Sequence, residues 1–194
     1  GPEGQFYLTD GHHTFSTLWE QPGVGPQMKM KVRITDVFSD SPDLPAFWAR
    51  MEKAHKVWLK DGNGQSIAPD QLPAHVGLQA MQNDILRSIV YFVRGAAYEK
   101  PKAGGVSPEF LEFYWADWLR GRLNLADYNL SERSGYHRAL QVASEMMVKP
   151  PLSKPVSGGM SAKQLGGFKS VKRKVLTKTA DEKLPLLIEY KTTR

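Results

Sequence analysis

The sequence contains no cysteine. This absence excludes disulfide bonds, zinc sites built from thiolates, and catalysis by a cysteine nucleophile. No apolar run approaches the roughly 20 residues that a membrane-spanning helix needs, so we expect no membrane partner. Internal repeats are absent as well, and no targeting segment is visible. We therefore expect a cytoplasmic location, while the oligomeric state stays open.

The positive charge is concentrated near the C-terminus. Residues 1–148 carry 15 Lys and Arg against 17 Asp and Glu, whereas residues 149–194 carry 11 against 3. The first region has the length and apolar content of one domain with its own core. We expect residues 1–148 to form that domain and residues 149–194 to form a basic tail containing Pro and Gly. An arm that binds nucleic acid is one interpretation of the tail, and a solvated segment is the other.

The apolar periodicity predicts several helices and a few short strands. Helices are expected near residues 12–19 and 43–54, and from Asp84, Ser107 and Ser131 onward. Strands are expected at residues 6–8 and 28–37, and a small hairpin at residues 57–67. Asp61 and Asn63 in that hairpin fit a plain turn better than a calcium loop. Residues 184–190 are interpreted as a short strand or a docking segment.

Residues 5–20, QFYLTDGHHTFSTLWE, stand out from the rest of the chain. The expected strand ends at Asp10 and Gly11, and a helix begins immediately after them. Asp10 is a favoured helix N-cap, and Gly11 permits a tight turn. Because a helix N-terminus attracts anions, this turn is a natural phosphate site. His12 and His13 add side chains that can donate or accept a proton near neutral pH.

The two histidines do not form a typical zinc site. Metal-binding pairs on a helix are four residues apart, whereas His12 and His13 are adjacent. The other three histidines, His55, His75 and His137, lie at no helpful spacing. Helix capping with packing is the structural alternative to an acid–base role for this pair.

The motif YLTDGHHTF resembles the signature of the ParB/sulfiredoxin superfamily, in particular the ParB-like nuclease branch known as ParBc_2. The resemblance continues through FWARMEKAHKVWLKDGNGQSIAPDQLP, RSIVYFVRGAAYEK and FLEFYWADWLR, and so covers roughly residues 1–148. It implies an α+β fold, in which several helices pack around a small mixed sheet. It also implies a nucleotide or nucleic-acid phosphate site on this motif. Relatives take part of that site from a preceding segment, so we expect the domain to extend before residue 1.

Three branches of the superfamily imply different chemistry. The sulfiredoxin branch has a reactive cysteine where His12 stands, which excludes its reductase activity here. His13 matches that branch's phosphate-binding histidine, while Thr14 replaces its arginine. The free-serine-kinase branch also shows Asp-Gly-His-His, which implies that Asp10 is the base or a magnesium ligand and that Gly11 to Thr14 line the phosphates. The partition-protein branch needs a helix-turn-helix domain, which is not visible here.

We therefore expect a phosphoryl-chemistry enzyme, either a nuclease or a nucleotide hydrolase, with Mg²⁺ and ATP or ADP as candidate cofactors. Asp10, His12 and His13 are the expected catalytic residues, and Asp10 the expected metal ligand. A small-molecule phosphotransferase is one alternative. A non-enzymatic protein that binds DNA or a partner through its tail is the other. Nucleotide or nucleic acid is the expected partner.

Further site residues are predicted outside the motif. Gly11, His13 and Thr14 are expected to bind phosphate together with Arg94, which lies in a matching block and seven residues after Arg87. Glu112 and Trp115 lie within an aromatic stripe, where a carboxylate is unusual, and could form a wall of the site. In the tail, the expected nucleic-acid contacts are Lys169, Lys172, Arg173 and Lys174.

Overall fold

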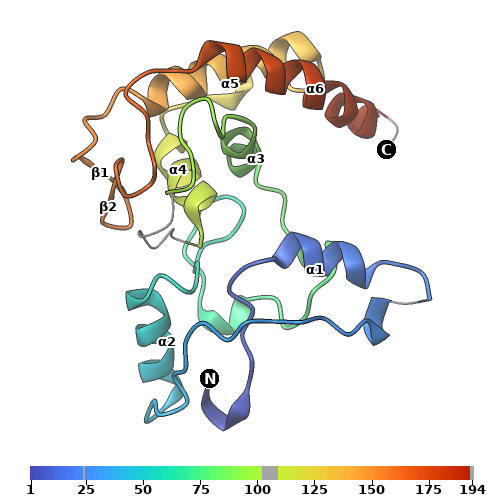
Figure 1. The fold of residues 1–194 in the computed structure, drawn as a ribbon, viewed down its shortest axis with the longest axis vertical. Coiled ribbons are helices and arrows are strands. Elements are labelled where there is room, and N and C mark those ends of the chain that lie inside the picture. Colours follow the sequence, from blue (N-terminus) through green and yellow to red (C-terminus); the bar gives the residue numbers. More distant parts are fainter. Residues whose placement is uncertain (24, 102–108, 193–194) are drawn as a thin grey trace. The chain divides into compact units, whose positions relative to one another are not determined.

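A computed structural model describes residues 1–23, 25–101 and 109–192 of the chain (Figure 1). The contacts between residues divide the chain into two compact units, residues 1–83 and residues 84–194. The second unit is the more extensively packed of the two, and it holds most of the buried apolar side chains. The predicted division after residue 148 stays a prediction.

The first unit contains helices α1 (His12–Trp19) and α2 (Leu44–Lys53), joined by irregular segments and single 3₁₀ turns. The sequence predicted both helices, and both are confirmed. Asp43 caps α2, because its carboxylate accepts a hydrogen bond from the Ala46 amide at 2.7 Å. Phe47 and Met51 are the buried residues of α2. The ring of Tyr7 packs 4.7 Å from that of Phe47, which holds the N-terminal segment against α2.

The two strands predicted at residues 6–8 and 28–37 do not form among the described residues. Residues 6–8 and 28–37 pair with no strand among the described residues. Phe6 is 82% exposed, and Val32 is 65% exposed, so the apolar side of each segment covers no sheet. An alternating pattern stabilises a strand only where a neighbouring strand completes its backbone hydrogen bonds. The predicted strands were therefore wrong.

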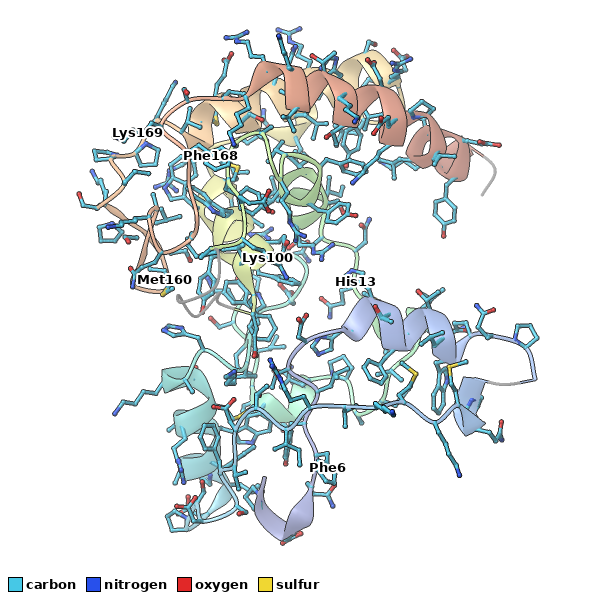
Figure 2. The ribbon with its side chains drawn as sticks, viewed as in Figure 1. Phe6, His13, Lys100, Met160, Phe168 and Lys169 are labelled. Atoms are coloured by element: carbon cyan, nitrogen blue, oxygen red, sulfur yellow. The ribbon has the colours of Figure 1, made fainter. Side chains whose placement is uncertain are left out.

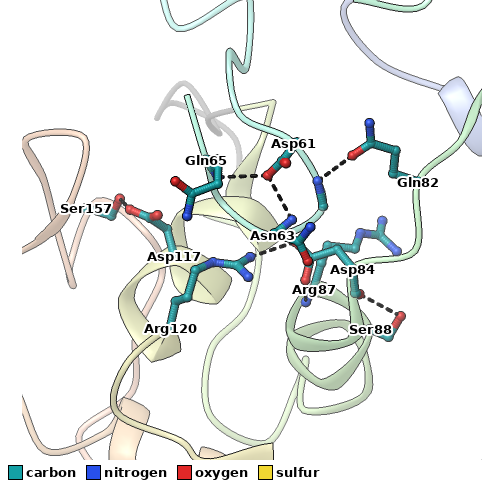
Figure 3. Close-up of polar contacts among 11 residues, drawn as sticks. Asp61, Asn63, Gln65, Gln82, Asp84, Arg87, Ser88, Asp117, Arg120 and Ser157 are labelled. Atoms are coloured by element: carbon teal, nitrogen blue, oxygen red, sulfur yellow. Dashed lines mark hydrogen bonds and ion pairs between the residues drawn. The ribbon is translucent and has the colours of Figure 1, made fainter. Parts of the chain in front are cut away.

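The predicted hairpin at residues 57–67 is present in minimal form. Lys60 and Ser66 form an isolated antiparallel bridge. Between them, one carboxylate oxygen of Asp61 accepts hydrogen bonds from the Asn63 amide at 2.9 Å and the Gln65 amide at 2.8 Å (Figure 3). Asp61 thus stabilises the turn through its own neighbouring backbone, as the turn interpretation predicted.

The second unit is built from four helices and one small sheet. The helices are α3 (Ile85–Phe92), α4 (Leu111–Leu119), α5 (Arg133–Met147) and α6 (Arg173–Thr192). Strands β1 (Pro155–Ser157) and β2 (Met160–Ser161) form the only sheet of the described residues, and they are antiparallel. Helices α3, α4 and α5 pack together around side chains that are completely buried, including Ile89, Leu119 and Leu140. This mixture of helices and a small sheet is consistent with the predicted α+β class.

Two helices of this unit, α3 and α5, begin within two residues of their predicted starts, whereas α4 begins four residues after its predicted start. The helix predicted from Asp84 begins there, with Asp84 as the cap of α3, and α5 begins two residues after Ser131. The predicted cap at Ser107 lies outside the described residues, and α4 begins at Leu111. No helix of the described residues is long and apolar enough to cross a membrane.

Helix α6 runs alongside α5 and belongs to the core of this unit (Figure 1). Leu176, Ala180 and Leu184 recur every fourth residue and are all buried. This spacing places them on one face of the helix. The predicted strand at residues 184–190 is wrong, because these residues continue the helix past Pro185.

Candidate phosphate site and arginine cluster

The turn before α1 is the centre of the predicted site. Gly11 has φ of +84° and directly precedes the first helical residue, so a residue with a side chain would be strained there. Asp10 does not cap the helix as predicted. Its carboxylate instead accepts a hydrogen bond from the adjacent Gly11 amide at 2.7 Å. No side chain caps α1, and its first turn contains no acidic residue. The Asp10 carboxylate is therefore the acidic group beside this positive end of the helix dipole, and it precedes the first turn.

The side chains of the motif differ in their access to solvent. Asp10, His13 and Thr14 are exposed, whereas His12 is half-buried. Figure 2 shows His13 on the first turn of α1. A carboxylate, an imidazole and a hydroxyl thus lie within five residues at one helix start. That combination can hold a phosphate group and exchange protons with it.

Two contacts fix α1 in its unit, and the sequence analysis missed both. Ser16 is buried, and its hydroxyl accepts a hydrogen bond from the Gly77 amide at 3.2 Å. Glu20 accepts one from the Leu78 amide at 3.0 Å. Both partners lie about sixty residues away along the chain, so no local pattern could have indicated them. These bonds attach the part of α1 after residue 14 to residues 77 and 78 of the same unit.

The side chains at this turn fit a Mg²⁺ ion only if a bound phosphate and water supply most of its oxygen ligands. Among the described residues, no three His, Asp or Glu side chains gather closely enough to hold a metal ion. Asp10 would therefore be a single protein ligand. Magnesium commonly binds in this way, through one or two carboxylates with water and substrate phosphates completing its octahedral shell.

Arg94, predicted as a phosphate ligand, lies in the second unit just after α3 ends. The seven-residue spacing had suggested that Arg87 and Arg94 share a helix. They do not, because Arg87 lies within α3 and Arg94 lies beyond its end. Its guanidinium forms an ion pair with Glu112, which is only 6% exposed. Glu112 stands on the first turn of α4, where the helix dipole also favours its negative charge. This pairing accounts for the carboxylate that looked unusual within the aromatic stripe.

The surroundings of this ion pair are buried and aromatic. Tyr98 is completely buried and donates its hydroxyl hydrogen to the Val90 carbonyl at 3.1 Å. Burial raises the pKa of Tyr98 to about 12, although a hydrogen bond with Arg94 opposes the shift. Trp115 is also completely buried, and its indole N–H donates to the Leu165 carbonyl at 3.0 Å. Trp115 therefore belongs to the core of this unit.

A second ion pair of this unit also has a buried carboxylate. Asp84 is 8% exposed, and its Oδ2 lies 3.0 Å from a guanidinium nitrogen of Arg120 (Figure 3). Its other oxygen accepts the Arg87 amide at 3.0 Å, which caps α3. Residues 10–14 belong to the first unit, whereas Arg94 and Glu112 belong to the second. Their union in one site stays a prediction.

Comparison with protein families decides the membership of the chain. A family model described as "Putative ParB-like nuclease" matches residues 1–121, which include the turn at Gly11 and the Arg94–Glu112 pair. The chain belongs to this ParB-like family. The resemblance seen in the sequence is therefore confirmed. No curated protein and no solved structure matches the chain.

The basic residues predicted to contact nucleic acid lie beyond the part that matches the ParB-like family. Lys169, Lys172, Arg173 and Lys174 are all exposed around the start of α6. The ammonium group of Lys172 lies 3.9 Å from the centre of the Phe168 ring, and Figure 2 shows Phe168 beside Lys169. Arg173 forms a weak ion pair with Glu145 at 3.3 Å.

A shallow hollow adjoins this basic segment. Its volume is about 510 Å³, and its lining combines Pro150, Pro151 and Leu152 with Lys149, Lys163 and Lys169. No acidic residue occurs anywhere in residues 149–174, which contain seven Lys and Arg. The lining of the hollow therefore has three lysines and no acidic residue, a composition that favours a polyanion.

Proposed function

We propose that the protein hydrolyses the phosphoester bonds of nucleic acid or the phosphoanhydride bonds of nucleotides, with the phosphate bound at residues 10–14. The observation that carries the proposal is the Asp-Gly-His-His-Thr turn, in which Asp10, His13 and Thr14 are exposed, at a helix start without a side-chain cap, in a chain of the ParB-like family. The backbone amides and the dipole of α1 would attract the phosphate. Gly11 would let it approach the backbone closely.

Each side chain of residues 10–14 would contribute to the reaction. Asp10 would accept a proton from the attacking water as the water oxygen bonds to phosphorus. His13 would donate a proton to the leaving oxygen as its bond to phosphorus breaks. Thr14 would hold a non-bridging oxygen, and His12, half-buried, would orient the neighbouring imidazole. As a magnesium ligand instead of the base, Asp10 would hold the ion together with the phosphate oxygens, and the ion would supply positive charge there.

The test is turnover by the intact chain. Single- and double-stranded DNA, RNA, ATP and ADP should each be incubated with it, with and without Mg²⁺. We expect cleavage or hydrolysis of at least one of these substrates. Nucleotide binding with no turnover would refute the hydrolase and favour a nucleotide-controlled clamp. Transfer of phosphate from ATP to a hydroxyl compound would favour the phosphotransferase alternative.

A second candidate function, binding of nucleic acid without catalysis, is favoured by the basic segment at residues 149–174. The seven cations there face no acidic residue within the segment. Each phosphate that a cation neutralises releases a counterion, so binding should weaken steeply with salt. This segment could also deliver substrate to a hydrolytic site.

We expect the double variant Lys163→Gln and Lys169→Gln to bind DNA more weakly and with a shallower salt dependence. Loss of two phosphate contacts should reduce the slope of log K against log salt by about 1.8 for duplex DNA. Fluorescence anisotropy at several salt concentrations measures the slope. Lys53→Gln, which removes an exposed lysine in the first unit, is the control. An unchanged slope in the double variant would remove the hollow from the interface.

A further inference from the structure

Tyr91, on α3, lies at the centre of an unusual group of positive charges. Three cations lie within 5.7 Å of the centre of its ring: the guanidinium groups of Arg87 and Arg94 and the ammonium group of Lys183 on α6. The ring is 39% exposed. Solvent can therefore reach a place where two helices of the same unit bring like charges together.

One of the three charges is neutralised within the protein. Arg94 forms its ion pair with the buried carboxylate of Glu112. Among the residues that the structure describes, no carboxylate lies within ion-pair distance of Arg87 or Lys183. Within the described residues, Arg87 and Lys183 therefore contact the Tyr91 ring and form no ion pair with a carboxylate.

Nearby carboxylates are engaged elsewhere. Asp84 is paired with Arg120 at 3.0 Å. Asp181 and Glu182 directly precede Lys183, but they pair with two other cations, Arg133 at 2.5 Å and Lys178 at 3.8 Å. None of these three carboxylates forms its ion pair with Arg87 or Lys183.

The interactions of Arg87 do not compensate for its burial. Its side chain is half-buried, and its Nε is buried without a hydrogen-bond partner. Burial lowers the pKa of Arg87, and the charge of Arg94 also lowers it, whereas Tyr98, Tyr91 and Asp84 oppose part of the shift. Its guanidinium lies 5.7 Å from the Tyr91 ring and 5.7 Å from the Phe113 ring. Two such contacts offset only part of the cost of removing an ion from water.

We propose that Arg87 and Lys183 form a phosphate-binding site beside Tyr91. A phosphate group supplies the missing negative charge and several oxygen acceptors. The planar guanidinium can bind two of these oxygens, and the ammonium group adds a mobile point charge. The phosphate can come from a free anion or nucleotide, or from the backbone of single-stranded nucleic acid.

This site is built from residues of the second unit alone, whereas the turn at residues 10–14 belongs to the first. Lys183 lies outside the residues matched by the family model, so the complete site is a feature of this chain. Binding there does not require hydrolysis. The Arg87–Lys183 site can therefore be wrong while the proposed hydrolysis at residues 10–14 holds. Hydrolysis can likewise be absent while phosphate binds at Arg87 and Lys183.

The experiment compares two variants with two matched controls in the full chain. Arg87→Gln and Lys183→Gln remove the two unneutralised charges. Arg122→Gln removes another arginine that lies over a ring, 4.8 Å from that of Trp118, and Lys178→Gln removes a paired lysine of α6. Inorganic phosphate, ADP and a labelled ten-residue oligothymidine serve as probes. Calorimetry and anisotropy give their dissociation constants at a fixed low salt concentration.

We expect each of the two site variants to weaken binding of at least one probe by about tenfold, and the controls to leave it within about twofold. An effect on oligothymidine alone identifies the nucleic-acid backbone as the source, and an effect on phosphate or ADP alone identifies a free anion. Equal losses in all four variants would reveal unspecific attraction and overturn the proposal, as would no loss in either site variant. If Arg87→Gln does not fold, Arg87→Lys and the exposed Lys183→Gln decide the matter.

Discussion

Asp10→Asn and His13→Ala should each reduce phosphoester hydrolysis by about a hundredfold or more. That loss is typical when a positioned acid–base or charge-stabilising group is removed. Asparagine keeps the size and hydrogen-bonding shape of Asp10 but loses its charge and its ability to accept a proton. Both side chains are exposed, so neither substitution disturbs the core. Initial rates with and without Mg²⁺ measure the effect.

The matched controls for these variants are Asp70→Asn and His75→Ala. Both residues are exposed and belong to the same unit as the motif. They should retain full activity and unchanged helix content by circular dichroism. Full activity in Asp10→Asn would remove this carboxylate from the mechanism. Full activity in His13→Ala would assign the proton donor elsewhere, with His12 as the next residue to test.

Glu112→Leu should lower the free energy of unfolding more than any of the substitutions at exposed residues. Glu112→Leu leaves the Arg94 guanidinium without its carboxylate at a site where Glu112 is only 6% exposed. Breaking a buried ion pair by removing one partner costs about 3–5 kcal/mol. We expect a loss toward the lower end of that range, because the Arg94 side chain is 30% exposed and water can reach it. Chemical denaturation followed by circular dichroism measures the change.

A double variant separates loss of the pair from loss of packing. Glu112→Leu combined with Arg94→Met should be more stable than Glu112→Leu alone, since it leaves no unpaired buried charge. The exposed pair of Arg173 and Glu145 is the matched control, and Glu145→Gln should change stability by less than about 1 kcal/mol. If the double variant loses as much as the sum of both single variants, the ion pair contributes little.

The sequence predicted the parts of the fold that depend on local signals. Asp43 and Asp84 are helix caps whose side chains bond to amides three residues later, and both helices form where these caps place them. The motif helix α1 also has its predicted bounds. Such features arise from neighbouring residues, so a short stretch of sequence contains the necessary information.

Features that depend on distant partners were not predictable in the same way. The alternation at residues 28–37 resembles a strand, but no second strand pairs with it in the described residues. The Ser16–Gly77 hydrogen bond and the Arg94–Glu112 ion pair join segments far apart in the chain. The cations around Tyr91 become visible only when α3 and α6 are placed together.

The packing of α6 also changes how the basic segment must be tested. Deleting residues 150–194 would remove the buried Leu176, Ala180 and Leu184 from the second unit. A loss of DNA binding after truncation could then reflect unfolding. Substitution of exposed lysines leaves this apolar face intact, and it is the sharper experiment.

The most direct test of the proposed phosphate site is an NMR titration of the full chain with ADP and Mg²⁺. Our account predicts that the backbone amide signals of Gly11, His12, His13 and Thr14 shift together with one saturating dissociation constant, and that Asp10→Asn weakens this binding with Mg²⁺ present. Shifts near Arg87 and Lys183 would report the second site separately. Saturable ADP binding that leaves the amides of residues 11–14 unmoved would contradict the account.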